Sequence, residues 1–360
     1  MTRPTVTPRH AAIALSGACA ALLGFGTTPP AAAQSVAEFY KGKTVSVYSG
    51  LSEGGSYSNY ARLVQRHLGK HIPGNPGTVF RHKPGAVGMV LARWMNSVAP
   101  KDGLIVGTFH ERIALEPLIA PQGIPFNGRD FTWIAALGTN PSVCFTWAAT
   151  GIKTVKDTQS KEVISGASGI AATDAVMARL MNATLGTKFR IIFGYKGADV
   201  LLAMEQGEVQ ARCGFGYPSL KTTRPQWLRD KKINILAQLS DKPHPEIPDV
   251  PLLMNLVAPQ YKAAVRLAGA TDAMARPYAA PPGIPKDRAE ALRKAFADMM
   301  KDKEFLADAK KQNLEIDFTP GSEISGVLDD LYKTPKEAVE LLRKFRTPGA
   351  TESKIAPKKK

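Results

Sequence analysis

The chain has 360 residues, of which 44% are hydrophobic, and a formal net charge of +16 at pH 7. This composition excludes a mainly disordered protein, and the length is sufficient for two globular domains of ordinary size. A strong positive charge can indicate nucleic-acid binding, but the basic residues are spread along the chain without a zinc-finger, RNA-recognition or helix-turn-helix signature. The charge therefore favours small anions, and not nucleic acid, as partners.

Residues 1–33 have the three parts of a secretory signal peptide. Arg3 and Arg9 give a basic start, residues 11–25 are apolar, and Ala33 ends an A-x-A cleavage site. The apolar stretch is shorter than the roughly 20 residues that a membrane-spanning helix needs. Cys19 stands in a poor match to a lipoprotein signal. We expect cleavage after Ala33 and a soluble mature chain in the periplasm.

The first part of the mature chain alternates strands with Gly-rich loops and helices. Strands are predicted at 45–48, 78–81 and 104–109, with helices starting at Ser58 or Asn59 and after Gly88. The loops at 52–58 and 83–88 follow the first two strands. Strand, loop and helix repeated in this order predict a parallel sheet with its loops at the carboxyl edge.

The second part repeats this pattern. Residues 131–137 and 142–148 are interpreted as extended connectors. Two α/β units of similar layout suggest two lobes that face a cleft. The elements expected after the connectors are strands at 162–165, 189–193 and 209–213, Gly-rich loops at 166–172 and 194–197, helices at 173–181 and around 200–204, a helix at 286–300, a strand at 314–318, and helices from Ser322 and Pro335.

Two cysteines, Cys144 and Cys213, remain after cleavage. An even pair in an oxidising compartment is a candidate disulfide. Each cysteine lies in a β-like run, so adjacent strands could bring the two together. The alternative is a pair of buried free thiols.

Known catalytic and metal-binding motifs are not matched. Gly42-Lys43-Thr44 imitates the end of a P-loop but precedes a strand, and Ile170 stands where a nucleophile elbow requires glycine. The histidines form no zinc-protease or zinc-finger spacing. We therefore predict no enzyme activity, no cofactor and no metal. A hydrolase built on Ser168 and His110 is the remaining enzymatic alternative.

The loops are better suited to hold an anion. Backbone N–H groups at a helix start attract negative charge, glycine lets the backbone approach a ligand, and hydroxyls donate hydrogen bonds to carboxylate oxygens. Tight turns without a ligand are the alternative reading of the glycines. The candidate ligand-binding residues are Ser52, Gly54, Gly55, Ser56, Tyr57, Ser58, Gly85, Val87, Gly88, His110, Ser168, Gly169, Ala171, Thr173 and Tyr195.

Several further segments carry a family resemblance, in order, over nearly all of the mature chain. They are Phe39-Tyr40-Lys41-Gly42-Lys43-Thr44, Gly54-Gly55-x-Tyr57-x-x-Tyr60-Ala61-Arg62, His71-Ile72-Pro73-Gly74-Asn75-Pro76, Lys83-Pro84-Gly85-Ala86-x-Gly88, Val98-Ala99-Pro100-Lys101-Asp102-Gly103, Gly194-Tyr195-x-Gly197, Glu208-Val209-x-x-Arg212-Cys213-Gly214 and Ala280-Pro281-Pro282-Gly283. In these segments the chain resembles the extracytoplasmic solute receptors of tripartite tricarboxylate transporters.

The resemblance implies the two-lobe type II fold of periplasmic binding proteins, with two mixed sheets flanked by helices and a ligand cleft between the lobes. It also implies a carboxylate ligand, gripped by the loops at 52–58 and 165–173, and a membrane permease that receives it. The first loop departs from the family pattern, because Glu53 and Ser58 stand where proline and aspartate are usual. This departure argues against a ligand that needs an acidic partner from that loop. Glu53 is expected to point outward.

We therefore expect a monomeric periplasmic receptor for a small carboxylate. The alternative in another class is a sensor that reports ligand occupancy to a membrane signalling protein. The expected organisation is a signal peptide at 1–33, the first part of lobe 1 at 34–139, lobe 2 at 140–245, the remainder of lobe 1 with a crossover at 246–346, and a basic flexible tail at 347–360.

Overall fold

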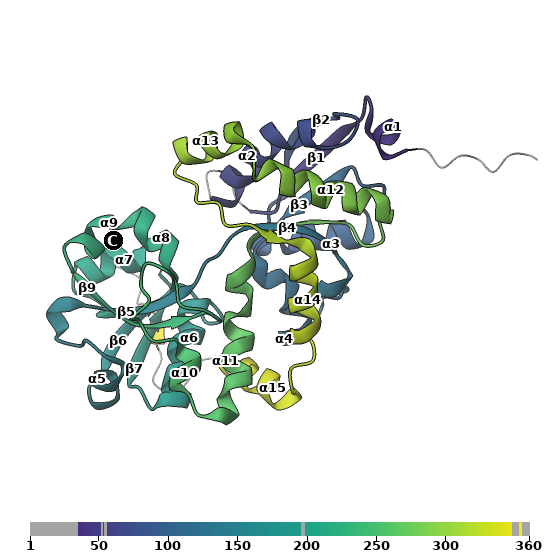
Figure 1. Cartoon of the computed structure of the whole chain (residues 1–360). Coiled ribbons are helices and arrows are strands. Elements are labelled where there is room, and N and C mark those ends of the chain that lie inside the picture. The colour runs from purple at the N-terminus through teal and green to yellow at the C-terminus, as the bar shows by residue number, and fades with distance from the viewer. Residues whose placement is uncertain (1–34, 52, 54–55, 196–198, 348–352, 355–360) are drawn as a thin grey trace, which may run out of the picture. The chain divides into compact units, whose positions relative to one another are not determined.

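A computed structural model describes residues 35–51, 53, 56–195, 199–347 and 353–354. The described chain forms two six-stranded mixed sheets flanked by helices, which confirms the expected fold class (Figure 1). The predicted signal peptide lies outside the described residues. Among those residues, no helix has the combination of length and apolar content that crossing a membrane requires.

The first sheet has the strand order β11-β4-β10-β3-β1-β2. Strands β2 and β3 run parallel to β1, whereas β10 runs antiparallel to both β3 and β4. The parallel part is the one that the sequence pattern predicts. The strands are β1 (Thr44–Ser49), β2 (Gly77–His82), β3 (Ile105–Thr108), β4 (Thr132–Gly138), β10 (Ala275–Ala280) and β11 (Thr319–Pro320).

The second sheet has the strand order β12-β7-β6-β8-β5-β9. Strands β7 and β8 run parallel to β6, and β5 runs antiparallel to β8 and β9. The strands are β5 (Ser142–Trp147), β6 (Val163–Ala167), β7 (Phe189–Phe193), β8 (Ala211–Gly216), β9 (Ile233–Leu239) and β12 (Ser353–Lys354).

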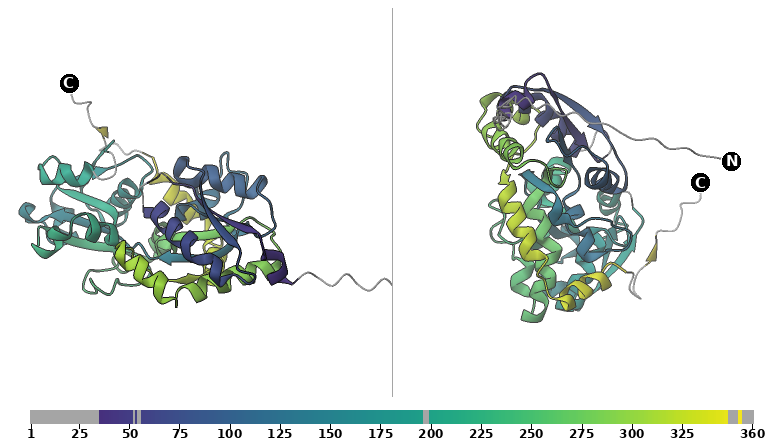
Figure 2. Two further views of the ribbon diagram at one scale, coloured as in Figure 1. Left: turned by 90° about the horizontal axis from the view of Figure 1, so that it is seen from above. Right: turned by 90° about the vertical axis from the view of Figure 1, so that its right-hand side faces the viewer.

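Helices cover the sheets, as the views in Figures 1 and 2 show. Strand β4 is buried along nearly its whole length because α12 and α14 pack against it. The helices are α1 (Val36–Tyr40), α2 (Ser56–Leu68), α3 (Met89–Ser97), α4 (Glu116–Ile119), α5 (Val155–Ser160), α6 (Thr173–Leu185), α7 (Asp199–Glu205), α8 (Tyr217–Thr223), α9 (Pro225–Arg229), α10 (Leu253–Leu256), α11 (Lys262–Gly269), α12 (Lys286–Met299), α13 (Lys303–Lys311), α14 (Gly321–Leu331) and α15 (Lys336–Lys344).

Up to β11 the chain passes between the two sheets at two places, and β12 later returns it to the second sheet. The short link between β4 and β5 is the first crossing, and the segment between β9 and β10, which contains α10, α11 and the 3₁₀ helix η7 (Ala270–Met274), is the second. Asp272 of η7 joins them: its carbonyl oxygen accepts a hydrogen bond from Asn140 N at 2.7 Å, and its carboxylate accepts one from Ser142 N at 3.1 Å. The two crossings are therefore held to each other.

Some predicted elements differ from those observed. The expected connectors at 131–137 and 142–148 are core strands, β4 and β5. The expected strand at 314–318 is an irregular segment, which makes one backbone hydrogen bond to β4, from Asp317 N to the Leu137 carbonyl at 3.3 Å, before the short strand β11 pairs with β4. One reason is that the Glu315 carbonyl accepts a hydrogen bond from the Tyr60 hydroxyl at 2.5 Å, not from a strand. Within the predicted tail, residues 353–354 form β12, which pairs with β7; the flexibility of the tail stays a prediction.

The structure links Cys144 of β5 to Cys213 of β8, with the two sulfurs 1.94 Å apart. The two strands are antiparallel neighbours, and both cysteines are buried. The bridge closes a loop with a sequence separation of 69 residues. On the chain-entropy model, closing a loop of this length reduces the entropy of the unfolded chain and so stabilises the folded state by about 4 kcal/mol.

We expect reduction of this disulfide to lower the free energy of unfolding by about 4 kcal/mol. The measurement is urea denaturation with and without dithiothreitol. A C144A/C213A variant is the control, because it should be as unstable as the reduced protein and insensitive to the reductant. Equal denaturation midpoints for the oxidised and reduced wild type would contradict the expectation.

An ionic network joins the end of α2 to α13. The carboxylate of Asp308 lies 2.9 Å from Arg66 Nη2 and 3.0 Å from His67 Nε2, and that of Asp302 lies 3.0 Å from His71 Nε2. The hydrogen bonds from His67 and then Arg66 lower the pKa of Asp308 to about 2. The charged carboxylate is therefore favoured in the folded state, so this network stabilises the packing of α13 on α2.

An Asp308→Asn variant is expected to be less stable than the wild type at pH 7, by up to about 1 kcal/mol for so exposed a network. Since the pKa of Asp308 is lower in the folded than in the unfolded state, its contribution is complete above pH 4 and is lost as the pH falls toward 2. The melting-temperature difference between variant and wild type should shrink over that interval. The exposed Asp249→Asn substitution serves as the control. A difference independent of pH would exclude the carboxylate charge as its cause.

Candidate functional site

The carboxyl ends of the parallel strands in the two sheets meet at a group of three connected cavities. The one in the middle, here called the central cavity, has a volume of about 250 Å³. It is lined from both sheets and from both crossings. Its lining residues are Ser56, Tyr57, His110, Glu111, Arg112, Asn140, Ser142, Thr173, Gly214, Phe215, Gly216, Ser219, Ala268, Thr271, Asp272 and Arg276.

The second cavity, here called the loop cavity, has a volume of about 550 Å³ and shares four residues with the central cavity: His110, Arg112, Thr173 and Gly214. Three arginines and two carboxylates line it, which leaves an excess of one positive charge. The remaining lining residues are Ala86, Val87, Met89, Ile113, Glu116, Ser168, Ala171, Ala172, Asp174, Arg212 and Arg346.

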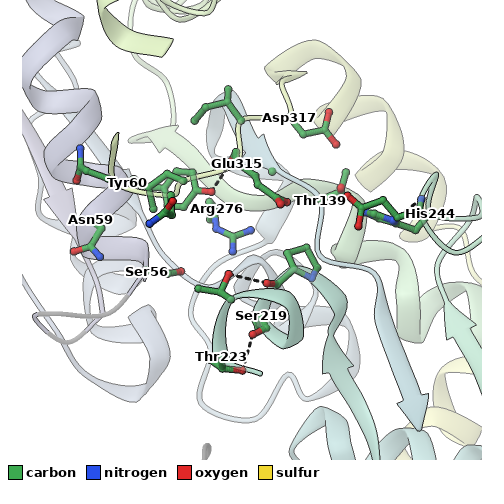
Figure 3. A pocket seen from close by; sticks show the side chains of 18 of the residues that line it. Ser56, Asn59, Tyr60, Thr139, Ser219, Thr223, His244, Arg276, Glu315 and Asp317 are labelled. Atoms are coloured by element: carbon green, nitrogen blue, oxygen red, sulfur yellow. Dashed lines mark hydrogen bonds between the residues drawn. The ribbon is translucent and has the colours of Figure 1, made fainter. Parts of the chain in front are cut away.

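The third cavity, here called the Tyr60 pocket, has a volume of about 580 Å³ and is shown in Figure 3. It shares Ser56, Ser219 and Arg276 with the central cavity. In Figure 3 the Arg276 side chain lies within the pocket, between Tyr60 on one side and Ser219 on the other. The pocket is therefore continuous in its lining with the central cavity.

One hydrogen bond connects the two sheets across the cavities. Arg112 lies in the 3₁₀ helix η3 (Glu111–Ala114), directly after β3, and its Nη1 donates to Oγ1 of Thr173, the first residue of α6, at 2.9 Å. Burial lowers the pKa of Arg112 from its usual value, because the low-dielectric surroundings disfavour the charge. A positive group that has lost water in this way is well placed to hold an anion.

Two buried carboxylates face the central cavity. Glu111 and Asp272 are 2% and 7% exposed. The Tyr57 hydroxyl donates a short hydrogen bond to Glu111. Burial, and then the neighbouring Glu111, raise the pKa of Asp272 well above its usual value. The site therefore contains both signs of charge in a region with little water.

Other charges of the loop cavity are already paired. Arg212 and Asp174 are 6% and 3% exposed and lie 3.5 Å apart, and Asp174 also accepts a hydrogen bond from Ser168 N at 2.9 Å. Arg346 lies 2.9 Å from Glu116. These pairs fix the walls of the cavity, and Arg112 supplies its excess positive charge.

The structure places part of the predicted site at these cavities. Ser56 and Tyr57 line the central cavity, Val87, Ser168 and Ala171 line the loop cavity, and His110 and Thr173 line both. Ser52, Gly54 and Gly55 lie outside the described residues. Contact of any of these residues with a ligand stays a prediction.

The other predicted residues line none of the three cavities: Ser58, Gly85, Gly88, Gly169 and Tyr195. Ser58 is buried, with its Oγ 3.2 Å from both Ser49 Oγ and His82 Nε2. Gly88 has a φ of +99°, and a side chain there would collide with Phe109. Glu53 is 72% exposed and bonded to Arg62, as expected for an outward direction.

The sequence analysis missed most of the charged groups of the site. Glu111 and Arg112 immediately follow His110, so the rule that selected His110 at the end of a strand could also have found them. Asn140, Asp272 and Arg276 come from the crossings and from β10. No motif marks them, because Arg276 reaches the site through the antiparallel course of β10, and Asn140 and Asp272 reach it through the two crossings.

A group with metal-ligand chemistry lies elsewhere in the described chain. His67, Asp302 and Glu304 have ligand atoms within 4.8 Å of one another. The Lys70 ammonium lies 2.7 Å from Asp302 and 2.5 Å from Glu304, so it is already paired with both carboxylates. We assign this group to the network between α2 and α13.

Comparison with known families gives one family model that matches this chain. The family model described as "Tripartite tricarboxylate transporter family receptor" matches residues 60–318. This range includes every lining residue named above except Ser56, Tyr57 and Arg346. No curated protein matches the chain.

Solved structures with the same fold include solute-binding proteins. One is a TctC solute binding protein from Polaromonas, at 17% identity and a TM-score of 0.65, covering 85% of this chain and 98% of that one. Another is Rpa4515 of R. palustris with adipate, at 16% identity, a TM-score of 0.59, and coverage of 84% and 97%. A third is MatC of Rhodopseudomonas palustris with bound malate, at 18% identity, a TM-score of 0.55, and coverage of 84% and 99%.

Gly214 lines both the central and the loop cavity and packs β8 against the start of α6. Its φ is +70°, and a Cβ there would lie 2.4 Å from the Thr173 carbonyl oxygen. We expect Gly214→Ala to lower the free energy of unfolding through backbone strain of about 1–2 kcal/mol and overpacking of about 1–3 kcal/mol. The matched control is Gly151→Ala, which has a φ of +71° but open space around the Cβ. Equal losses in urea denaturation would show that the close approach to Thr173 is unimportant.

Proposed function

The chain belongs to the tripartite tricarboxylate transporter receptor family, and from this premise we propose that it is a periplasmic receptor that binds a small carboxylate between its two sheets and delivers it to a membrane permease. The family consists of solute receptors and not of enzymes, so the proposed role involves no chemical change of the ligand. Residues 1–33 would direct export and be removed.

The observation that carries the proposal is the position of Arg112. It lies at the junction of the central and loop cavities and donates a hydrogen bond to Thr173 of the other sheet. A ligand carboxylate near Arg112 would therefore contact groups from both sheets. Such contacts favour the conformation in which the sheets are close together, which is how a ligand drives closure of a two-lobe receptor.

The electrostatics support a carboxylate. The loop cavity has one positive charge in excess, and Arg112 forms no ion pair with any carboxylate in the described parts of the chain. Hydroxyl groups of Ser168 and Thr173 line the same cavity. Hydroxyl donors beside a guanidinium bind carboxylate oxygens well, because hydrogen bonds to a charged group are stronger than neutral ones. Bound malate and adipate in structures of the same fold are consistent with this class of ligand.

The test has two steps. Isothermal titration of the refolded protein with mono- and dicarboxylates, including amino acids, identifies the tightest binder. That compound is then titrated into the variants. Arg112→Gln should weaken binding by about tenfold to a hundredfold, the usual loss for a hydrogen bond to a charged group. Arg229→Gln is the matched control, because that side chain is 76% exposed and pairs with Asp230. If no carboxylate binds the wild type, or if the Arg112 variant binds as tightly, the proposed function is wrong.

Transfer to a permease is tested by an uptake assay with a reconstituted permease of the tripartite tricarboxylate transporter type. Uptake of the bound acid should require the receptor and should fall with Arg112→Gln in parallel with binding. Binding without any receptor-dependent uptake would favour the sensor alternative.

A further inference from the structure

A lysine at the edge of the Tyr60 pocket is bonded to two carboxylates. Lys221 lies in α8, directly after β8 of the second sheet. Its ammonium donates a hydrogen bond to the Glu246 carboxylate at 2.6 Å and another to the Glu315 carboxylate at 3.1 Å. The two carboxylates differ in which sheet holds them, so the two bonds have different consequences.

Glu246 is held on the second sheet, like Lys221 itself. It follows β9, and its neighbour His244 donates its backbone N–H to the side chain of Gln238 in β9 at 2.9 Å. The hydroxyl of Tyr217, the first residue of α8, donates to Glu246 at 3.3 Å. The bond between Lys221 and Glu246 therefore does not depend on the position of the first sheet.

Glu315 is held on the first sheet. Its carbonyl oxygen accepts a hydrogen bond from the hydroxyl of Tyr60 in α2 at 2.5 Å, as Figure 3 shows. Leu314 and Ile316, on either side of it, pack against the hydrophobic core between α2, α12 and the first sheet. The bond between Lys221 and Glu315 therefore joins the second sheet to the first, and it breaks when the sheets move apart.

This bond lies outside the two cavities that contain Arg112. Glu315 lines the Tyr60 pocket and also a neighbouring groove of about 600 Å³, which Lys221 lines as well. Neither residue lines the central cavity or the loop cavity. Lys221 and Glu315 thus belong to the wall between the Tyr60 pocket and the groove, where they do not contact a ligand held in the central cavity.

The strength of the bond suits a contact that breaks and forms again. The Lys221 side chain is 28% exposed, and the side chains of Glu246 and Glu315 are 50% and 60% exposed. Ion pairs with this much exposure contribute little free energy, so one of them cannot lock the two sheets together. When Glu315 moves away, Lys221 retains Glu246 as its partner. Separation of the sheets therefore leaves the lysine with a counter-charge.

We propose, on the basis of the receptor function above, that Lys221 and Glu315 are a positioning pair, which stabilises the arrangement with the sheets close together and so raises the affinity for the ligand without contact with it. Arg112 and Thr173 connect the sheets inside the cavities, and Lys221 and Glu315 connect them at the outer wall of the Tyr60 pocket. A ligand that requires the sheets to be close together binds more tightly when a second contact already favours that arrangement.

The first test is isothermal titration of the full mature receptor with the carboxylate that binds the wild type most tightly. Glu315→Gln removes the charge that Lys221 meets across the sheets, so the Kd should rise by about twofold to fivefold, the range for an exposed ion pair. Glu246→Gln is the matched control, because it removes the other carboxylate of the same lysine but no contact between the sheets. Its Kd should be unchanged or lower.

Two further measurements distinguish the charge from a general structural effect. The ratio of the Kd of Glu315→Gln to that of the wild type should approach one in about 1 M salt, because salt screens exposed charges. Lys221→Glu should weaken binding, and combining it with Glu315→Lys should restore it, since the reversed pair attracts again. Melting curves verify that each variant is folded.

Spin labels report the arrangement of the sheets in the absence of a ligand. They are attached at Gln206→Cys, directly after α7 of the second sheet, and at Lys311→Cys in α13, which packs on α2; both positions are exposed. Pulsed electron resonance then gives the distribution of distances between the labels. Glu315→Gln should shift this distribution, whereas Glu246→Gln should leave it unchanged.

The outcomes distinguish this inference from the proposed function. If a carboxylate binds the wild type but Glu315→Gln binds it as tightly, or if Glu246→Gln weakens binding by the same factor, the inference is wrong and the carboxylate receptor stands. If no carboxylate binds the wild type, the proposed function and the effect on affinity are both wrong. In that case the spin-label distances alone decide whether Lys221 and Glu315 hold the sheets together.

Discussion

The rest of the structure depends on how Asp272 joins the two crossings. Its carbonyl and its carboxylate accept hydrogen bonds from Asn140 N and Ser142 N, so the segment that leaves the first sheet is bound to the segment that returns to it. Backbone groups in a buried crossing need such partners, since an unpaired buried N–H is strongly unfavourable. The same carboxylate lines the central cavity. A structural requirement of the crossing thus places an acidic side chain in the site.

The direction of β10 completes the site from the other side. Because β10 runs antiparallel to β3, with Tyr278 opposite Thr108, its first residues lie beside the segment that follows β3. Arg276 therefore lies on the same side of the sheet as His110, although 166 positions separate them in the chain, and both residues line the central cavity. Parallel strands alone would have placed only loops and helix starts at this edge. The antiparallel strand adds fixed charge to it.

The difference between local strand–loop–helix units and a strand added from a distant part of the chain explains which parts of the molecule could be predicted from the sequence. Helix α12 and strands β1 and β7 were predicted nearly to the residue, since local apolar periodicity determines them. Ser56, Val87, Ser168 and Thr173 at the cavities followed from the strand–loop–helix pattern. Strand β10 was not predicted, because Arg276 and Pro277 interrupt its apolar run and its stability comes from β3 and β4. Without β10, neither Asp272 nor Arg276 could be assigned to the site.

The two kinds of contact at the cavities have different consequences for ligand choice. Backbone N–H groups and hydroxyls accept many carboxylates, because they offer partial charges and adjust to the oxygen positions. Buried ionised side chains discriminate, because each one left without its counter-charge opposes binding. Arg112 is bonded to Thr173 across the sheets, whereas Arg276 retains an unpaired buried Nε. In the proposed receptor, Arg112 would therefore couple occupancy to the approach of the two sheets.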